Sequence, residues 1–172
     1  MKMIKIAAVA AALAATPAFA ADFAGPYVGG GVTLDNVQGS GALEGVGFSG
    51  VGATAFAGYN LPVGASTFAG VEANIDLNTA DAGGVEAKWG WGVGARFGYK
   101  LNDSTALYAR AGYARGKIEV LGSSGWGDGV RYGAGLETRV TDSVSLRAEF
   151  TQTNYEADII NNQGTLGIVF GF

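Results

Sequence analysis

Hydrophobic and polar residues alternate one by one over long stretches of this chain. Between residues 88 and 101, every second residue is apolar, and the residues between them are glycines or cations. A period of two places successive side chains on opposite faces of a strand, so this segment has one apolar and one polar face. No helical period of useful length occurs after Gly25, because glycine interrupts nearly every window and disfavours helix. The pattern predicts strands.

The alternation recurs along the whole chain. The predicted strands are 27–34, 51–59, 69–77, 88–101, 107–113, 130–140, 144–150 and 166–172. Three connections are short and rich in turn residues, at 61–64, 102–104 and 141–143. The other four, at 35–49, 78–86, 121–128 and 156–163, are longer and polar or glycine-rich. Short turns at one end and long loops at the other indicate an up-and-down meander whose two ends face different environments.

Glycine occupies much of the polar face of the predicted strands. This composition indicates whether that face is exposed to water or lies inside a closed barrel. A soluble sandwich or lipocalin-like barrel would expose the polar face to water, where bare glycine only weakens a strand. Inside a closed eight-stranded barrel there is little room, and glycine fits. The apolar segments, about 9 to 11 residues long, also match tilted strands that cross a bilayer. We therefore predict an all-β, eight-stranded antiparallel up-and-down transmembrane β-barrel with a polar, glycine-rich interior and an apolar exterior.

The composition removes most catalytic chemistry. The chain has 172 residues with 30 Gly, no Cys and no His. Thiolate and imidazole metal sites, cysteine nucleophiles and histidine-based triads are therefore excluded. The Gly-x-Gly stretches, such as residues 90–94, lie inside predicted strands with no following helix, which rejects a dinucleotide-binding loop. We expect no enzymatic activity, no cofactor and no metal centre.

The first twenty residues have the order of a secretory signal peptide. Lys2 and Lys5 precede an apolar stretch, and small residues end the segment: cleavage is expected after Ala18-Phe19-Ala20, before Ala21. The predicted domains are thus a signal peptide over 1–20 and a barrel over 21–172. The net charge is −4, and without the two lysines nine cations face fifteen acids, giving −6. This sign argues against nucleic-acid binding.

Aromatic residues are expected to form two girdles at the membrane interfaces. On the predicted lipid-facing side, Tyr59, Tyr99 and Phe172 fall near short-turn ends, and Trp89, Trp91 and Tyr132 fall toward long-loop ends. Aromatic rings concentrate at both interfaces of membrane barrels. Trp126 and Tyr155 are expected in loops or at the rim.

Several charged residues have the parity of the interior face. Glu72, Arg96, Arg110 and Glu149 each lie about five residues from a short turn, which predicts one layer of two acids and two bases. A turn centred on Asp142 would place Glu137 opposite Arg147. A fixed plug of paired charges is favoured, because isolated charges in a narrow interior are costly. An ion gate or selectivity filter is the alternative. A catalytic carboxylate pair is disfavoured, since neighbouring cations keep the acids ionised.

Short motifs along the chain carry a family resemblance. They are GPYVGG at 25–30, AGYNL at 57–61, GVE at 70–72, LYARAGY at 107–113 and LGIVFGF at 166–172. In this order they resemble the small eight-stranded outer-membrane β-barrels, including opacity-protein-like and outer membrane protein A- or X-like barrels. The resemblance implies that alternating Leu166, Ile168, Phe170 and Phe172 are the signal that the outer-membrane assembly machinery reads. The resemblance does not extend to the enzymes of this group, because they rely on catalytic histidines and this chain has none.

These observations lead to one leading hypothesis and two alternatives. The first is a non-enzymatic barrel in the cell outer membrane, a surface antigen with a role in envelope integrity or adhesion. Its expected partners are outer-membrane lipids and lipopolysaccharide, the assembly machinery, and surface or host ligands reached through the loops. The second is a narrow, porin-like channel for ions or small solutes. The third is a soluble periplasmic β-barrel that binds an apolar ligand.

Overall fold

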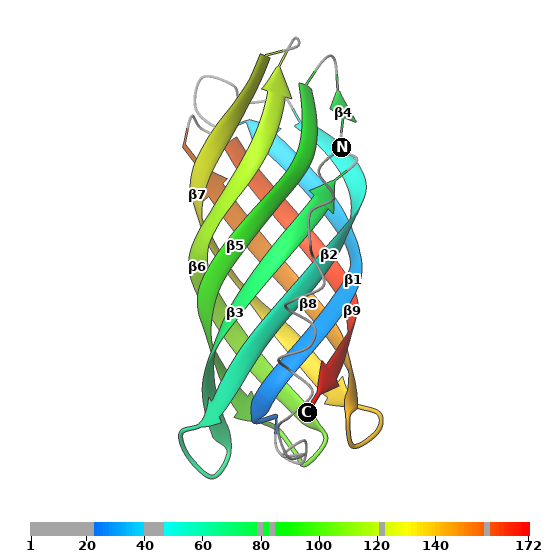
Figure 1. The fold of residues 1–172 in the computed structure, drawn as a ribbon, viewed down its shortest axis with the longest axis vertical. Coiled ribbons are helices and arrows are strands. Elements are labelled where there is room, and N and C mark those ends of the chain that lie inside the picture. Colours follow the sequence, from blue (N-terminus) through cyan, green and yellow to red (C-terminus); the bar gives the residue numbers. More distant parts are fainter. Residues whose placement is uncertain (1–22, 40–46, 79–80, 83–84, 121–122, 157–158) are drawn as a thin grey trace, which may run out of the picture.

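The computed structural model describes residues 23–39, 47–78, 81–82, 85–120, 123–156 and 159–172. Figure 1 shows that long strands run side by side around a closed ring. The strands are β1 (Gly25–Gly39), β2 (Gly47–Pro62), β3 (Thr67–Asn78), β4 (Asp81–Ala82), β5 (Val85–Lys100), β6 (Thr105–Val120), β7 (Ser123–Arg139), β8 (Val144–Tyr155) and β9 (Ile159–Gly171). Within the described residues, no helix has the length and apolar character needed to cross a membrane.

The strand order closes the sheet on itself. Neighbours follow the order β3-β2-β1-β9-β8-β7-β6-β5, and a further antiparallel pairing of β3 with β5 completes the ring. The two-residue strand β4 pairs only with the first two residues of β5, Val85 and Glu86. A closed ring has no sheet edge, so the strands leave no row of unpaired backbone groups facing lipid. The predicted eight-stranded up-and-down antiparallel barrel is confirmed.

The two ends of the barrel differ in their connections. At the lower end of Figure 1 the strands join through short turns, and β9 ends there beside the start of β1. The backbone N–H of Leu101 donates to the Thr105 carbonyl at 2.8 Å, and that of Val140 donates to the Val144 carbonyl at 2.9 Å. The longer hairpins lie at the opposite end. In outer-membrane barrels the short turns are periplasmic and the long loops extracellular.

The strands are longer than the alternation predicted. They reach 16 residues in β6 and 17 in β7, so the predicted loop at 121–128 is wrong from Ser123 onward. The predicted loops at 35–49, 78–86 and 156–163 are likewise partly strand. On the exterior of β6 the apolar residues stop at Tyr113, and Arg115 and Lys117 follow although the ladder continues. The β6–β7 hairpin therefore keeps its backbone pairing beyond the zone in which the exterior side chains are apolar.

Apolar side chains cover the exterior, and polar side chains fill the interior. Leu166 is 65% exposed and Val71 60% exposed, whereas Glu72, next to Val71 in the chain, is only 3% exposed. The buried set consists mainly of Thr, Asn, Gln, Asp, Glu and Arg. A soluble barrel would place these two sets the other way round. The arrangement is that of a barrel solvated by lipid.

Four large interior rings lie directly opposite glycines of neighbouring strands. The opposed pairs are Tyr27 with Gly58, Phe56 with Gly29, Phe68 with Gly98, and Tyr108 with Gly135. A Cβ atom on any of these glycines would stand closer than 3.0 Å to the opposing ring. Glycine is therefore the residue that lets an aromatic ring lie against the inner wall of this narrow barrel.

Candidate functional site

The lower half of the lumen holds a group of charged side chains that we call the ionic layer. It comprises Glu72 of β3, Arg96 of β5, Arg110 of β6, Glu137 of β7, and Arg147 and Glu149 of β8. Glu72 is central and contacts all three arginines. Its Oε2 lies 2.7 Å from Arg147 Nη1 and 3.3 Å from Arg96 Nη1, and its Oε1 lies 2.9 Å from Arg110 Nη1.

The remaining two carboxylates complete the ionic layer. Glu137 Oε2 lies 3.2 Å from Arg96 Nη2 and 3.1 Å from Arg147 Nη2. Glu149 Oε1 lies 3.0 Å from Arg110 Nη1. Glu137 and Arg147 are directly opposed across β7 and β8, on either side of the turn at Asp142. Three arginines thus balance three carboxylates, and no one of these side chains is more than 8% exposed.

Two tyrosines that the sequence reasoning missed belong to the ionic layer. The Tyr27 hydroxyl donates to Glu72 Oε2 at 2.8 Å and accepts from Arg96 Nη1 at 3.0 Å. The Tyr108 hydroxyl donates to Glu149 Oε2 at 2.6 Å, and the Arg96 guanidinium lies 3.9 Å from the centre of the Tyr108 ring. The available signal was their parity: both are aromatic residues at interior positions, and their neighbours on the same face are mostly glycine or alanine.

A second polar group lies above the ionic layer, nearer the long hairpins. Arg131 Nη1 lies 2.8 Å from Asp76 Oδ2, and its Nε donates to Thr153 Oγ1 at 2.9 Å. Asn74 links the two groups, because it donates to Asp76 Oδ2 and accepts from Arg110 Nη2 at 3.1 Å. A cavity of about 10 Å³ remains between the groups. That is room for roughly one water molecule.

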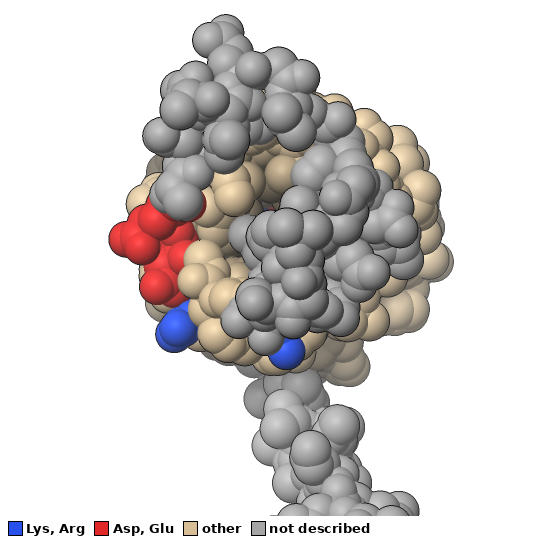
Figure 2. All heavy atoms as spheres, turned by 90° about the horizontal axis from the view of Figure 1, so that it is seen from above, with Lys and Arg blue, Asp and Glu red and all other residues tan. Residues whose placement is uncertain are grey.

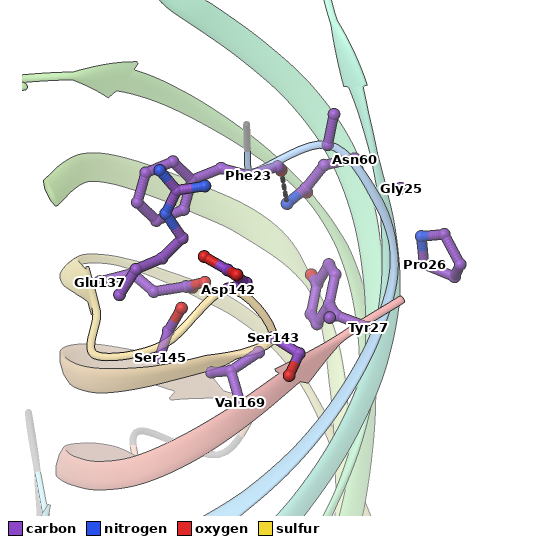
Figure 3. Close-up of a pocket in the computed structure, with 13 residues that line it drawn as sticks. Phe23, Gly25, Pro26, Tyr27, Asn60, Glu137, Asp142, Ser143, Ser145 and Val169 are labelled. Atoms are coloured by element: carbon purple, nitrogen blue, oxygen red, sulfur yellow. Dashed lines mark hydrogen bonds between the residues drawn. The ribbon is translucent and has the colours of Figure 1, made fainter. Parts of the chain in front are cut away.

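Phe23 and Ala24, the two described residues before β1, lie at the short-turn mouth of the lumen. Figure 3 shows the small pocket there, about 30 Å³, with Phe23 beside it. Asn60 Nδ2 donates to the Phe23 carbonyl at 2.8 Å, and the Phe23 ring stacks on Phe68 with centroids 6.2 Å apart. The Arg139 guanidinium lies 5.3 Å from the centre of the Phe23 ring. Aromatic packing thus covers the lower side of the ionic layer.

The exterior aromatic residues form contacts toward the end with the long hairpins. Trp89 meets Trp126 edge to face at 5.0 Å, and Trp91 meets Tyr113 at 5.6 Å. Trp126, expected in a loop or at the rim, lies near the start of β7 and is exposed on the exterior. The other exterior rings of the expected girdles, Tyr59, Tyr99 and Tyr132, are all exposed.

Tyr155, also expected in a loop or at the rim, is the last residue of β8. Its ring lies inside, where a Cβ on Gly116 would stand 3.1 Å from its hydroxyl. Both residues lie near strand ends and not in loops, since strand pairing continues after the lipid-facing alternation has ended.

The last strand closes the barrel against the first. Leu166, Ile168 and Phe170 of β9 are exposed on the exterior, and β9 pairs with both β1 and β8. Phe172 is half-buried, and its backbone N–H donates to the Pro26 carbonyl at 3.1 Å. The residues of the expected cleavage site, Ala18, Ala20 and Ala21, lie outside the described residues.

Comparison with known sequences places this geometry in a family. The sequence model of the outer membrane protein beta-barrel domain matches residues 6–172. A 22 kDa outer membrane protein of Rhizobium leguminosarum bv. viciae is 36% identical over 116 residues, which cover 63% of this chain and 54% of that protein. A 25 kDa outer-membrane immunogenic protein of Brucella ovis is 32% identical over 130 residues, covering 70% of this chain and 63% of that protein. The matched region spans less than two thirds of either relative.

Solved structures share the fold at low sequence identity. The attachment invasion locus protein Ail of Yersinia pestis, in complex with the heparin analogue sucrose octasulfate, has a TM-score of 0.63 and 16% identity, over 87% of this chain and 99% of that one. Neisserial surface protein A has a TM-score of 0.63 and 18% identity, over 86% of this chain and 97% of that one. With its closed barrel, apolar exterior and matching family model, the chain belongs to the outer membrane protein beta-barrel domain family and is a protein of the cell outer membrane.

Proposed function

We propose that this protein is a non-enzymatic structural barrel with a closed lumen. It supports the integrity of the envelope, and its extracellular surface contacts partners outside the cell. The observation that carries the proposal is the ionic layer. Six charged side chains and two tyrosine hydroxyls bridge the lumen from six different strands, and their charges balance. A balanced, hydrogen-bonded group of this kind resists displacement, because breaking one pair leaves a buried charge without compensation.

The proposal includes the route by which the chain reaches the membrane. Residues 1–20 act as a secretory signal peptide that is removed after Ala20. The alternating side chains of Leu166, Ile168, Phe170 and Phe172 serve as the signal for the outer-membrane assembly machinery. Three of them are exposed on the outer face of the closing strand, where a partner can reach them before the barrel is inserted. Lipid and lipopolysaccharide then surround the apolar exterior.

The extracellular side is proposed to carry the surface role. Brucella relatives are named as immunogenic outer-membrane proteins, and one structural neighbour was crystallised with a heparin analogue. Figure 2 shows Asp and Glu gathered on one side of the long-hairpin end, with one Lys or Arg group beside that patch and another farther along the rim. A chain that is acidic overall does not favour a sulfated polyanion. A neutral or basic surface partner fits this chain better.

A narrow channel is the competing function, and conductance measurements separate the two. The purified protein in planar lipid bilayers is expected to show no steady openings. The Glu72→Ala variant removes the carboxylate that joins all three arginines, and Asp128→Ala removes an exterior carboxylate that pairs with Arg115. Steady wild-type openings whose conductance changes with Glu72→Ala but not with Asp128→Ala would overturn the closed-lumen proposal.

The integrity role is tested in cells. A strain that lacks the gene is expected to become more sensitive to detergent and chelator, and the wild-type gene is expected to restore resistance. Glu72→Ala, if it reaches the membrane in normal amounts, is expected to restore it as well, since the role depends on the barrel and its surface. A deletion strain with an unchanged envelope would count against this part of the proposal.

A further inference from the structure

Two cations lie on the outer wall of the barrel, where the apolar surface of β6 ends. Alternate residues of β6 face outward, and after Tyr113 the next two of this series are Arg115 and Lys117, toward the end with the long hairpins. The other cations whose side chains the structure describes lie in the lumen or at the short-turn ends of their strands: Arg96, Arg110, Arg131 and Arg147, and Lys100 and Arg139. The closed lumen does not explain this exterior pair.

Tryptophans flank the two cations on both neighbouring strands. Lys117 is directly opposite Trp89 of β5 and Trp126 of β7, and Trp91 of β5 is opposite Arg115. The Trp89 and Trp126 rings meet edge to face with centroids 5.0 Å apart, and the Arg115 guanidinium lies 5.3 Å from the centre of the Trp126 ring. The chain has only these three tryptophans. Because tryptophan concentrates at the headgroup level of membranes, the cations lie at that level too.

One acid lies within this group and compensates it only in part. Asp128 Oδ1 lies 3.3 Å from Arg115 Nε, and the same oxygen accepts a hydrogen bond from the Tyr113 hydroxyl. Both side chains of the ion pair are about two-fifths exposed, so water weakens their attraction. Lys117 forms no ion pair with any residue that the structure describes. Two cations and one acid leave the group with one net positive charge.

Acids farther out on the same hairpins determine from which side an anion reaches the cations. Glu119 follows two residues after Lys117 on β6, and it is opposite Glu86 of β5. These acids lie on the water side of the cations and repel an anion that approaches from solution. An anion that belongs to the membrane surface instead approaches along the apolar wall. Arginine and lysine are the side chains that bind phosphate, and the phosphates of membrane lipids lie at the headgroup level.

We propose that Arg115 and Lys117, flanked by Trp89 and Trp126, bind a phosphate group of lipid A, the membrane-anchored part of lipopolysaccharide. The inference rests on the proposed contact of lipopolysaccharide with the exterior, and it assigns that contact to one place. The end with the long hairpins is extracellular in outer-membrane barrels, and lipopolysaccharide is the phosphorylated lipid of the outer leaflet. The phosphate accepts hydrogen bonds from the guanidinium and the ammonium, and the indole rings pack beside the head group.

Intrinsic fluorescence tests the site, because every tryptophan of the chain lies in it. The refolded barrel in a neutral detergent with EDTA is titrated with bisphosphorylated lipid A, with dephosphorylated lipid A and with phosphatidylglycerol. Bisphosphorylated lipid A is expected to change the tryptophan emission at the lowest concentration. Equal responses to the phosphorylated and dephosphorylated forms would overturn phosphate binding. An equal response to phosphatidylglycerol would overturn the assignment to lipid A.

Single substitutions locate the binding on the barrel. Lys117→Ala is expected to raise the lipid A concentration for the half-maximal change about fivefold, the equivalent of the roughly 1 kcal/mol that one cation contributes near an anionic membrane surface. Lys100→Ala removes a lysine at the opposite end of the barrel and is expected to leave that concentration unchanged. Asp128→Asn is expected to lower it, because it removes the acid that pairs with Arg115. Wild-type binding by Lys117→Ala would overturn the site.

The outcomes separate this site from the closed-lumen proposal. Heat-dependent electrophoretic mobility shows that each variant has refolded, and if Lys117→Ala does not refold, Asp128→Asn is the independent test: binding no tighter than that of the wild type would count against the site. Steady ion conductance would refute the closed lumen and leave lipid A binding intact, since the site lies on the outer wall. A refolded, non-conducting barrel that shows no preference for phosphorylated lipid A would refute this site alone.

Discussion

Tyr108 lies directly opposite Gly135 across β6 and β7, and its ring occupies the space that a side chain at residue 135 would need. This position brings the Tyr108 hydroxyl to Glu149 at 2.6 Å and places the ring under the Arg96 guanidinium. Glycine on the inner wall thus determines where a tyrosine lies, and the tyrosine in turn holds members of the ionic layer.

Gly135→Ala is expected to destabilise the barrel by about 1 to 3 kcal/mol, the usual cost of inserting atoms into a packed interior. The added Cβ would stand closer than 3.0 Å to three atoms of the Tyr108 side chain. Urea unfolding of protein refolded in lipid vesicles measures the change. Gly164→Ala is the matched control, because nothing lies within 4 Å of a Cβ at that position. Equal stability of the two variants would refute this explanation of the interior glycines.

Glu72→Gln is expected to cost about 3 to 5 kcal/mol, because it leaves three buried arginines with reduced compensation. The same unfolding assay measures the loss. Asp128→Asn provides the comparison: its partner Arg115 lies on the exterior with both side chains about two-fifths exposed, so the expected cost is below about 1 kcal/mol. If Glu72→Gln were as stable as Asp128→Asn, the ionic layer would have no role in holding the lumen closed.

An arginine placed on the lipid-facing surface should destabilise the barrel by an amount that depends on its depth in the bilayer. Ala134→Arg and Val93→Arg are expected to lose about 2 to 4 kcal/mol if these residues lie near the bilayer midplane. Both positions are exposed, so the loss cannot come from overpacking. Ala65→Arg, in the exposed turn between β2 and β3, is expected to change stability little. A small effect at all three positions would indicate a water-facing exterior.

Most of the fold was predictable because one physical pattern repeats. Lipid outside the barrel favours apolar side chains, and the narrow lumen inside favours small or polar ones, so the two kinds alternate along each strand. Val93, which lies between Gly92 and Gly94, is an example. The upper hairpins were not predictable in the same way. Beyond Tyr113 the exterior of β6 carries Arg115 and Lys117, so its apolar alternation stops, while backbone pairing continues β6 and β7.

The candidate site was predictable in part for the same reason. Parity and distance from the short turns place Glu72, Arg96 and Arg110 on one face at similar heights, and their mutual contacts follow from that. Contacts across the lumen do not follow from local spacing. The Arg147 contact with Glu72 joins residues 75 positions apart, and the Tyr27 hydroxyl reaches the same carboxylate only because Gly58 leaves room for the ring.

Deletion of Phe172 separates assembly from stability. The residue follows the last strand, and its backbone N–H makes one hydrogen bond to Pro26 at the barrel seam. The truncated protein is expected to reach the outer membrane of cells in much smaller amounts, while it refolds in detergent with nearly wild-type stability. Cell fractionation and detergent refolding measure the two effects. Normal assembly in cells would show that Phe172 is not part of the signal.

The account rests on lipid contact of the exterior face, and spin labelling tests that contact directly. The chain has no cysteine, so single variants Ala109→Cys and Ala111→Cys carry one label each on the exterior of β6, with Ala65→Cys in the short turn as control. In lipid vesicles, the two β6 labels are predicted to be accessible to oxygen and protected from a water-soluble nickel complex, and the turn label is predicted to show the reverse. Labels at Ala109 and Ala111 that the nickel complex reaches as easily as Ala65 would contradict a barrel solvated by lipid.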